Sequence, residues 1–468
     1  MNRKQFLLSL PGFALLPQIR AAEPATKATP KPAAKASAPL KLPPVQPGPP
    51  YLVAGPQLGH VGPTEARLWI RATAAVPWKI LLFPTDIPGQ MREITGPALN
   101  DDSAYLAIAL IAGLDPQTRY TYQVLLDGRE QLSRPLPNFL TAPPLGQSGR
   151  LRVVFGSCVG PTVAAAAPCW AELAERRLMN PDEGGFDLLL MLGDNHYANT
   201  TNLEKQRVYY TAHRLSAGWR DLTARTPVYA IWDDHDFGPN NSDGTEPGKE
   251  NSLRAFREFW ANPACGEPDN PGCYFTFTRG QVQFFMVDGR YYRTPNVAPD
   301  GPEKTMLGAK QLDWLKRELL SSKAAVKLVA MGSEWESFGS EDSWAVFRHE
   351  RDPFLRWIDE EKIEGVAFLS GDRHFSSGYH VLGRFLELSG GPFGSANAKL
   401  RPNAERFTGF DQGRLWGVLD IDTSGAQPTV AFEFWQAGGG RLERRELTWD
   451  QLHGREKVTL SPSLQLPA

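Results

Sequence analysis

The pattern of apolar and polar positions changes once along the chain. Between residues 51 and 145, apolar and polar residues alternate in short runs such as 66–71 and 120–124, and pairs such as Gly-Pro and Asp-Gly separate these runs. Alternation with a period of two is typical of strands that bury one face. The pattern therefore predicts an all-β sandwich over residues 51–145.

Between residues 150 and 455, the apolar runs are continuous, and windows with helical spacing lie between them. Residues 186–192 and 326–331 are two of these runs, and residues 310–320 place leucines three and four positions apart. Short continuous runs are typical of strands that are buried on both faces of an α/β sheet. We therefore expect a layered α/β domain over residues 150–455, followed by a frayed tail at residues 456–468.

Side chains of the kinds that bind ligands follow the predicted strands of this domain. They come after six strands: Cys158; Asp194 and Tyr197; Asp234 and His235; Asp288 and Arg290; Glu334; and Asp372 and His374. In open α/β sheets, ligands bind at the carboxyl ends of the strands. A solvated acidic turn is the alternative for any one of these stretches, but repetition at six strand ends favours a shared site.

The types of these side chains indicate a mixed metal centre. A thiolate and a phenolate suit a redox-type ion such as Fe(III), whereas carboxylates also suit Ca²⁺ or Mg²⁺. Gly156, Gly193 and Gly371 lie just before ligand-type residues. Glycine at these positions allows a sharp turn and a close approach of the backbone.

Composition limits the classes of partner. The chain has 468 residues, 41% hydrophobic and 22% charged, with a formal net charge of -2. These values fit a soluble globular protein of two or three domains and give no electrostatic footprint for nucleic acid. We therefore expect no specific nucleic-acid recognition. A monomer is our separate expectation. Beyond the N-terminus, no apolar run is long enough to span a bilayer.

The N-terminal residues resemble an export signal. Residues 1–22 begin with basic Arg3 and Lys4, become apolar and end in small residues, as a secretory signal peptide does. The basic pair resembles a twin-arginine signal in which one Arg is replaced by Lys, and a short amphipathic start is the alternative. Residues 23–50 are rich in Ala, Pro and Lys and predict an extended linker. We therefore expect a periplasmic or secreted protein, without a transmembrane segment once the signal is removed.

Several motifs of the α/β domain resemble those of calcineurin-like metallophosphoesterases, and most closely those of PhoD-like alkaline phosphatases. They are Gly156-Ser157-Cys158, Gly193-Asp194-x-x-Tyr197, Trp232-Asp233-Asp234-His235-Asp236 and Gly371-Asp372-x-His374. The resemblance runs from about residue 51 to the C-terminal region. It implies a two-sheet α/β sandwich flanked by helices for the second domain. In the first domain, residues 113–122 resemble the turn and strand of fibronectin type III-like sandwiches.

The resemblance also implies a ligand set for two metal ions. Asp194 would bridge the two positions. The first ion, Fe(III), would be completed by Cys158, Tyr197 and His374. The second ion, Ca²⁺, would be held by Asp234 and Asp372. Other divalent metals are alternatives at these positions.

Two further residues receive catalytic roles under this resemblance. His235 would protonate the leaving alkoxide or stabilise charge on the transferred phosphoryl group. Arg290 would clamp the phosphate, because a guanidinium fork matches two phosphoryl oxygens. A structural ion pair with a neighbouring carboxylate is the alternative for Arg290.

The sequence thus predicts an exported metal-dependent phosphoesterase that acts on phosphate monoesters, diesters or both. Two alternatives stay open. One is a phospholipase-type phosphodiesterase on the same scaffold, and the other is a non-catalytic surface-binding protein with a decayed site. In an exported protein we also expect a disulfide between Cys265 and Cys273, which flank a turn-rich loop.

Overall fold

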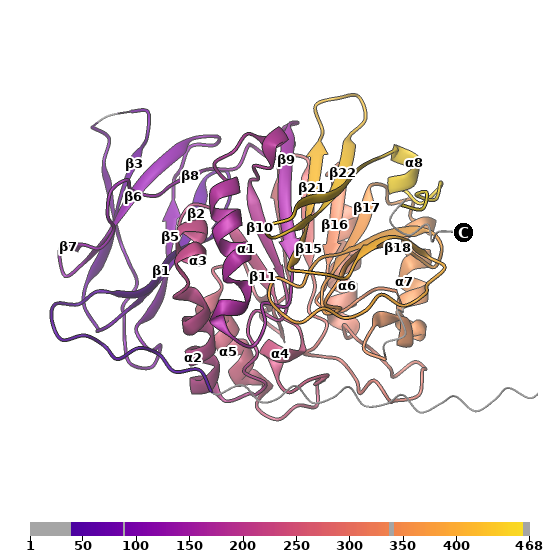
Figure 1. Cartoon of the computed structure of the whole chain (residues 1–468), viewed down its shortest axis with the longest axis horizontal. Helices are drawn as coiled ribbons and strands as arrows, with labels where there is room; N and C mark the ends of the chain where they lie inside the picture. Colours follow the sequence, from indigo (N-terminus) through magenta and orange to yellow (C-terminus); the bar gives the residue numbers. More distant parts are fainter. Residues whose placement is uncertain (1–38, 88, 337–340, 462–468) are drawn as a thin grey trace, which may run out of the picture. The chain divides into compact units, whose positions relative to one another are not determined.

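The computed structural model describes residues 39–87, 89–336 and 341–461 (Figure 1). The predicted signal peptide, most of the predicted linker and the end of the predicted tail lie outside these residues. Within the described ranges, no helix combines the length and the apolar character needed to cross a membrane.

The N-terminal part of the described chain consists of two antiparallel sheets that share one core. The first sheet contains β1 (Leu52–Val61), β2 (Glu65–Ala72) and β5 (Leu106–Ala112). The second contains β3 (Trp78–Pro84), β4 (Arg92–Thr95), β6 (Arg119–Leu126), β7 (Arg129–Glu130) and β8 (Asn138–Leu140). Leu68 from the first sheet and Ile80 from the second are fully buried in the common core. The all-β prediction is confirmed, and the fibronectin type III-like assignment stays a prediction.

The rest of the chain contains two larger sheets, as the continuous apolar runs predict. One has the order β11 (Val228–Ile231), β10 (Leu188–Leu192), β9 (Arg150–Gly156), β21 (Leu415–Asp422), β22 (Thr429–Gln436), β23 (Gly440–Leu447). The other has the order β14 (Phe275–Arg279), β15 (Val282–Met286), β16 (Val326–Ala330), β17 (Val366–Ser370), β19 (Phe385–Ser389), β18 (Ser376–Val381), β20 (Arg406–Phe410). Strands β9 to β11 are parallel, and so are β15, β16, β17 and β19.

Helices connect and flank these strands. They are α1 (Val163–Arg176), α2 (Leu203–Arg214), α3 (Ala217–Thr223), α4 (Asp234–Phe237), α5 (Lys249–Phe259), α6 (Ala309–Ser321), α7 (Arg348–Glu360) and α8 (Trp449–Leu452), with 3₁₀ turns η1 (Pro181–Glu183) and η2 (Trp344–Val346). Helix α6 coincides with the predicted helical window and buries Leu315 and Leu319. The layered α/β prediction is therefore confirmed.

Glycines let the strand ends of the two sheets approach each other closely. A Cβ on Gly332, which follows β16, would lie 2.7 Å from the Cβ of Asp233, which follows β11. A Cβ on Gly371, which follows β17, would lie 2.5 Å from the carbonyl oxygen of Leu192 in β10. Because real Cβ atoms do not approach so closely, only glycine fits at these two positions. The two sheets therefore bring their ligand-bearing loops together.

The predicted disulfide is absent. All four cysteines, Cys265 and Cys273 included, are free thiols in this structure. The loop between them is instead closed by a hairpin of β12 (Gly266–Glu267) and β13 (Asn270–Pro271), whose strands pair in antiparallel register. Backbone pairing already holds this turn-rich loop.

The N-terminal sandwich is hydrogen-bonded to α5 and to the residues that follow α3 and α5 in the α/β domain. The Trp69 indole donates to the carbonyl of Glu258 at 2.8 Å, and the Tyr122 hydroxyl donates to the carbonyl of Ala224 at 2.6 Å. The His60 amide donates to the carbonyl of Ala261 at 2.8 Å. At this contact, a Cβ on Gly59 would lie 2.1 Å from the Ala261 oxygen.

We predict that Gly59→Ala destabilises the protein, because the added methyl group must push β1 away from the segment after α5. Overpacking of this kind typically costs about 1–3 kcal/mol. Thermal unfolding measures the change. Gly149→Ala is the matched control, because a Cβ there meets nothing within 4 Å. Equal unfolding temperatures for the two variants would contradict the tight contact.

Candidate metal centre

Two groups of ligand-type side chains meet where the strands end, and they share one residue. Ligand atoms of Cys158, Asp194 and His374 lie within 4.8 Å of one another. So do ligand atoms of Asp194, Asp234 and His235. Asp194 belongs to both groups, which is the arrangement that a bridging carboxylate needs.

The loops that carry these residues turn through left-handed backbone. The φ angles are 61° at Cys158, 53° at Asp194, 63° at Asp372 and 57° at His374. A residue other than glycine seldom adopts this region and typically costs about 1–3 kcal/mol there, so it persists only where the surroundings enforce it. Four such residues at the ends of β9, β10 and β17 indicate backbone that is shaped for the site.

Tyr197 lies against the first group. Its hydroxyl donates to Asp194 Oδ2 at 2.8 Å, lies 3.3 Å from His374 Nε2 and accepts a hydrogen bond from Ser395 Oγ at 2.7 Å. The structure thus brings the four side chains predicted for the first metal together. Ser395 was missed because no local pattern marks it.

In the second group, Asp234 is the first residue of α4, a single helical turn. The Asn241 amide donates to Asp234 Oδ2 at 2.7 Å, whereas Asp234 Oδ1 is buried without a hydrogen-bond partner in the described part of the chain. His235 follows Asp234, and its Nδ1 lies 2.5 Å from Asn199 Oδ1. Because a carboxamide oxygen only accepts, this contact assigns the proton to Nδ1 and leaves Nε2 available. Asn199 has no signal in the sequence that identifies this contact.

Asp372 belongs to a third group, with Asp233 and Asp342, whose ligand atoms also lie within 4.8 Å of one another. The predicted pair of Asp234 and Asp372 is thus divided between two neighbouring groups. Sequence reasoning did not single out Asp342, since it lies in an irregular segment between β16 and α7. Only the folded chain brings Asp342 close to Asp233 and Asp372.

The placement of Arg290 corrects its prediction as a phosphate clamp. The side chain has no exposed surface. Its Nε donates to Asp233 Oδ1 at 2.6 Å, and Nη2 donates to Asp342 Oδ2 at 2.6 Å and to Ser333 Oγ at 3.1 Å. Arg293, also without exposed surface, donates to Asp342 as well. Arg290 therefore has the alternative role that the sequence left open, a structural ion pair, because carboxylates already occupy its guanidinium group.

Burial and mutual repulsion shift the pKa values of the acidic groups in the cluster. Burial raises the pKa of Asp194 well above its ordinary value, and Asp234 and Asp233 raise it further. Burial likewise raises the pKa of the Cys158 thiol, and Asp194 adds to this shift. Burial also acts to raise the pKa of Asp234, but His235 and Arg290 outweigh it, so that this pKa lies below its ordinary value. A thiol, a phenol, an imidazole and buried carboxylates in this state fit a site for metal cations.

Comparison with known families agrees with this geometry. The family model described as PhoD-like phosphatase matches residues 180–406. Residues 180–406 thus form a segment that is similar to PhoD-like phosphatases. The matched range contains Asp194, Tyr197, Asp234, Asp372 and His374. Cys158 precedes it, so the place of Cys158 in the site rests on the geometry.

Known proteins resemble different shares of the chain. Alkaline phosphatase D of Bacillus subtilis (strain 168) is 29% identical over 243 residues, which cover 42% of this chain and 41% of that protein. The match thus spans less than half of that relative. A second family model, described as a domain of unknown function (DUF7800), matches residues 49–143, which include the strands of the N-terminal sandwich.

Two solved structures share the fold of this chain. The structure of PhoD has a TM-score of 0.65 at 21% identity, covering 84% of this chain and 91% of that one. The purple acid phosphatase PPD1 from yellow lupin (Lupinus luteus) seeds has a TM-score of 0.62 at 13% identity, covering 84% and 74%. These likenesses show the fold alone.

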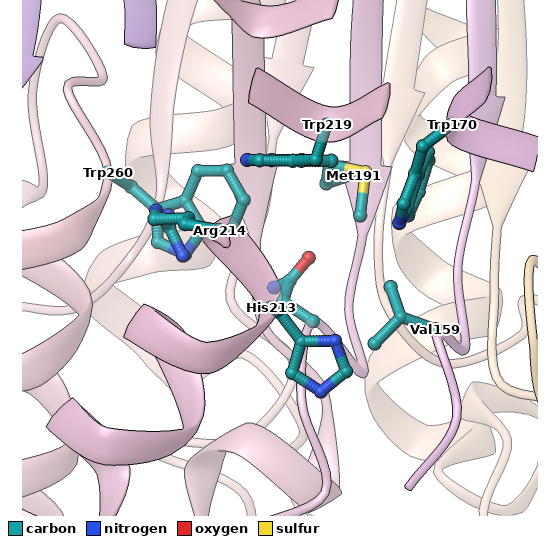
Figure 2. Close-up of a pocket in the computed structure, with 8 residues that line it drawn as sticks. Val159, Trp170, Met191, His213, Arg214, Trp219 and Trp260 are labelled. Atoms are coloured by element: carbon teal, nitrogen blue, oxygen red, sulfur yellow. The ribbon is translucent and has the colours of Figure 1, made fainter. Parts of the chain in front are cut away.

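A small cavity lies among Val159, Trp170 and Trp219, among other residues (Figure 2). The cavity has a volume of about 10 Å³, and Asn195, His213 and Arg214 also line it. Space of this size holds at most one water molecule, so the cavity is not a substrate cleft. The neighbouring His196 is fully buried, and its ring packs on Tyr210 with centroids 4.1 Å apart. His196 therefore packs against α2, the helix that carries Tyr210.

Proposed function

We propose that the protein is an exported, metal-dependent phosphoesterase of the alkaline phosphatase D type, which hydrolyses phosphate monoesters, diesters or both. The observation that carries this proposal is the pair of ligand groups that share Asp194 inside a PhoD-like phosphatase domain. Export rests on the sequence pattern of residues 1–22. In this account the N-terminal sandwich, proposed to be fibronectin type III-like, supports the domain beside it.

The proposed metals are Fe(III) and Ca²⁺. Cys158, Tyr197, His374 and Asp194 would hold Fe(III), since thiolate, phenolate and imidazole suit it. Asp234 and Asp372, with Asp194, would hold Ca²⁺, which prefers carboxylate oxygens. Bound metals would withdraw charge from the phosphoryl oxygens and lower the pKa of water that attacks in line.

His235 is the proposed proton donor to the leaving group. Asn199 binds Nδ1, so the opposite nitrogen, Nε2, is the one that can carry a proton to a leaving oxygen. The ring is partly exposed and lies with its centroid 4.2 Å from that of Tyr197. This contact and the bond to Asn199 hold the imidazole beside the metal groups, where a leaving alkoxide would form.

We predict that protein purified from its native host carries iron together with calcium. Thiolate and phenolate ligands favour the first, and the carboxylates favour the second. Elemental analysis of the purified protein measures both. Full activity in protein that contains zinc alone would contradict this metal assignment.

We predict that His235→Ala retains both metals and loses activity on alkyl phosphates by about 10²–10⁴-fold, the usual contribution of a general acid. The loss should shrink for p-nitrophenyl phosphate, because its leaving group scarcely needs a proton. Steady-state kinetics on the two substrate classes, with metal analysis of the same samples, measure both effects.

The matched control is His349→Ala, since His349 is exposed on α7. It should keep both activities. Parallel loss of metal and activity in His235→Ala would make His235 a ligand. Unchanged activity on alkyl phosphates would overturn the site assignment, and a wild-type enzyme inactive on all phosphate esters would overturn the proposed function.

A further inference from the structure

Residues 372–374 are partly exposed and lie at one accessible edge of the metal centre. The side chain of Asp372 is 20% exposed and that of Arg373 is 21% exposed, whereas those of Asp233 and Asp342 are 1% and 5% exposed. Arg373 lies between two residues of the metal groups, Asp372 and His374. Arg373 is therefore within reach of solvent beside the metal groups.

A buried carboxylate holds Arg373 in place. Glu334, which follows β16, has no exposed side-chain surface, and its Oε1 lies 2.5 Å from Arg373 Nε. In the described part of the chain, neither oxygen of Glu334 accepts a regular hydrogen bond. A buried carboxylate is costly unless it is paired, so this ion pair accounts for the position of Glu334.

The pairing through Nε leaves the two terminal nitrogens of Arg373 available. Nη1 lies 3.9 Å from Asp372 Oδ2, which is beyond hydrogen-bond distance. The structure gives no hydrogen bond from either terminal nitrogen to a described residue. Arg290 differs, because its terminal nitrogens already donate to Asp342 and Ser333. Arg373 thus has open donors where Arg290 has none.

We propose that Arg373 binds a non-bridging oxygen of the phosphoryl group at the metal centre, and that Glu334 is the positioning residue for its guanidinium. This inference rests on the proposed phosphoesterase function. The chemistry is a match between a fork of N–H donors and anionic phosphoryl oxygens, which is the geometry in which arginine recognises phosphate. Nη1 lies 3.9 Å from Asp372 Oδ2, in the acidic group that lines the centre, so a phosphate bound there would lie near its donors.

The test measures binding of inorganic phosphate to the metal-loaded full chain by titration calorimetry. A hydrogen bond to a charged group contributes enough that Arg373→Met should raise the phosphate Kd by about tenfold to hundredfold. Metal content should not change. The phosphate Kd of Arg373→Lys should lie between those of the wild type and Arg373→Met, since a single ammonium replaces the guanidinium fork. Glu334→Gln should weaken binding less, because the guanidinium remains.

The double variant Arg373→Met/Glu334→Gln keeps the test valid if the single variant fails to fold. It removes both charges together, so no buried carboxylate is left unpaired. Its phosphate Kd should equal that of Arg373→Met, because Glu334 acts only through Arg373. The matched control is Arg317→Met on α6. It breaks an exposed ion pair with Glu267 of β12 and should leave the phosphate Kd unchanged.

A wild-type phosphate Kd in the double variant would overturn the inference. Loss of metal in proportion to loss of phosphate binding would also overturn it, because Arg373 would then stabilise the ligands and not the phosphate. The proposed function is tested separately by hydrolysis of p-nitrophenyl phosphate by the wild-type protein. A wild-type enzyme that hydrolyses this ester, combined with an unchanged Kd in the variant, would refute the role of Arg373 alone.

Discussion

The structure depends on burying several carboxylates side by side where the strand ends of two sheets meet. Asp194 and Asp233 are almost completely buried, and each raises the cost of ionising its neighbours. Glycines such as Gly332 and Gly371 permit this approach, because a Cβ there would collide with the opposing strand end. Like charges at such distances persist in a protein interior when arginines or bound metal cations lie among them, and otherwise some of the carboxyl groups take up protons.

Arginines neutralise one side of the cluster and leave the other side to metals. Arg290 and Arg293 pair with Asp233 and Asp342, and all four side chains are buried. Asp194 and Asp234 have no comparable arginine partner among the described residues. Buried Arg290 is thus occupied by carboxylates, which is why we assign the proposed phosphate-binding role to partly exposed Arg373.

Local sequence pattern was sufficient to predict the strands and the ligand-type side chains that follow them. Cys158, Asp194 and His374 follow buried strands, so their convergence follows from the geometry of parallel sheets. Asn199, Asp342 and Ser395 escaped prediction, because their roles depend on contacts between segments far apart in the chain. The clamp predicted for Arg290 and the disulfide failed for the same reason. The partner Asp342 and the hairpin beside Cys265 become visible only in the folded chain.

The most direct test of this account is the thermal unfolding temperature of the metal-loaded protein compared with that of the same protein after chelation. The account predicts a marked decrease after chelation, and full recovery when the metals are returned, because ligands that bind only the native state stabilise it. The decrease should be smaller in Asp194→Asn, which carries one charge fewer in the cluster. Equal unfolding temperatures for the loaded and stripped proteins would contradict the claim that cations hold the buried carboxylates together.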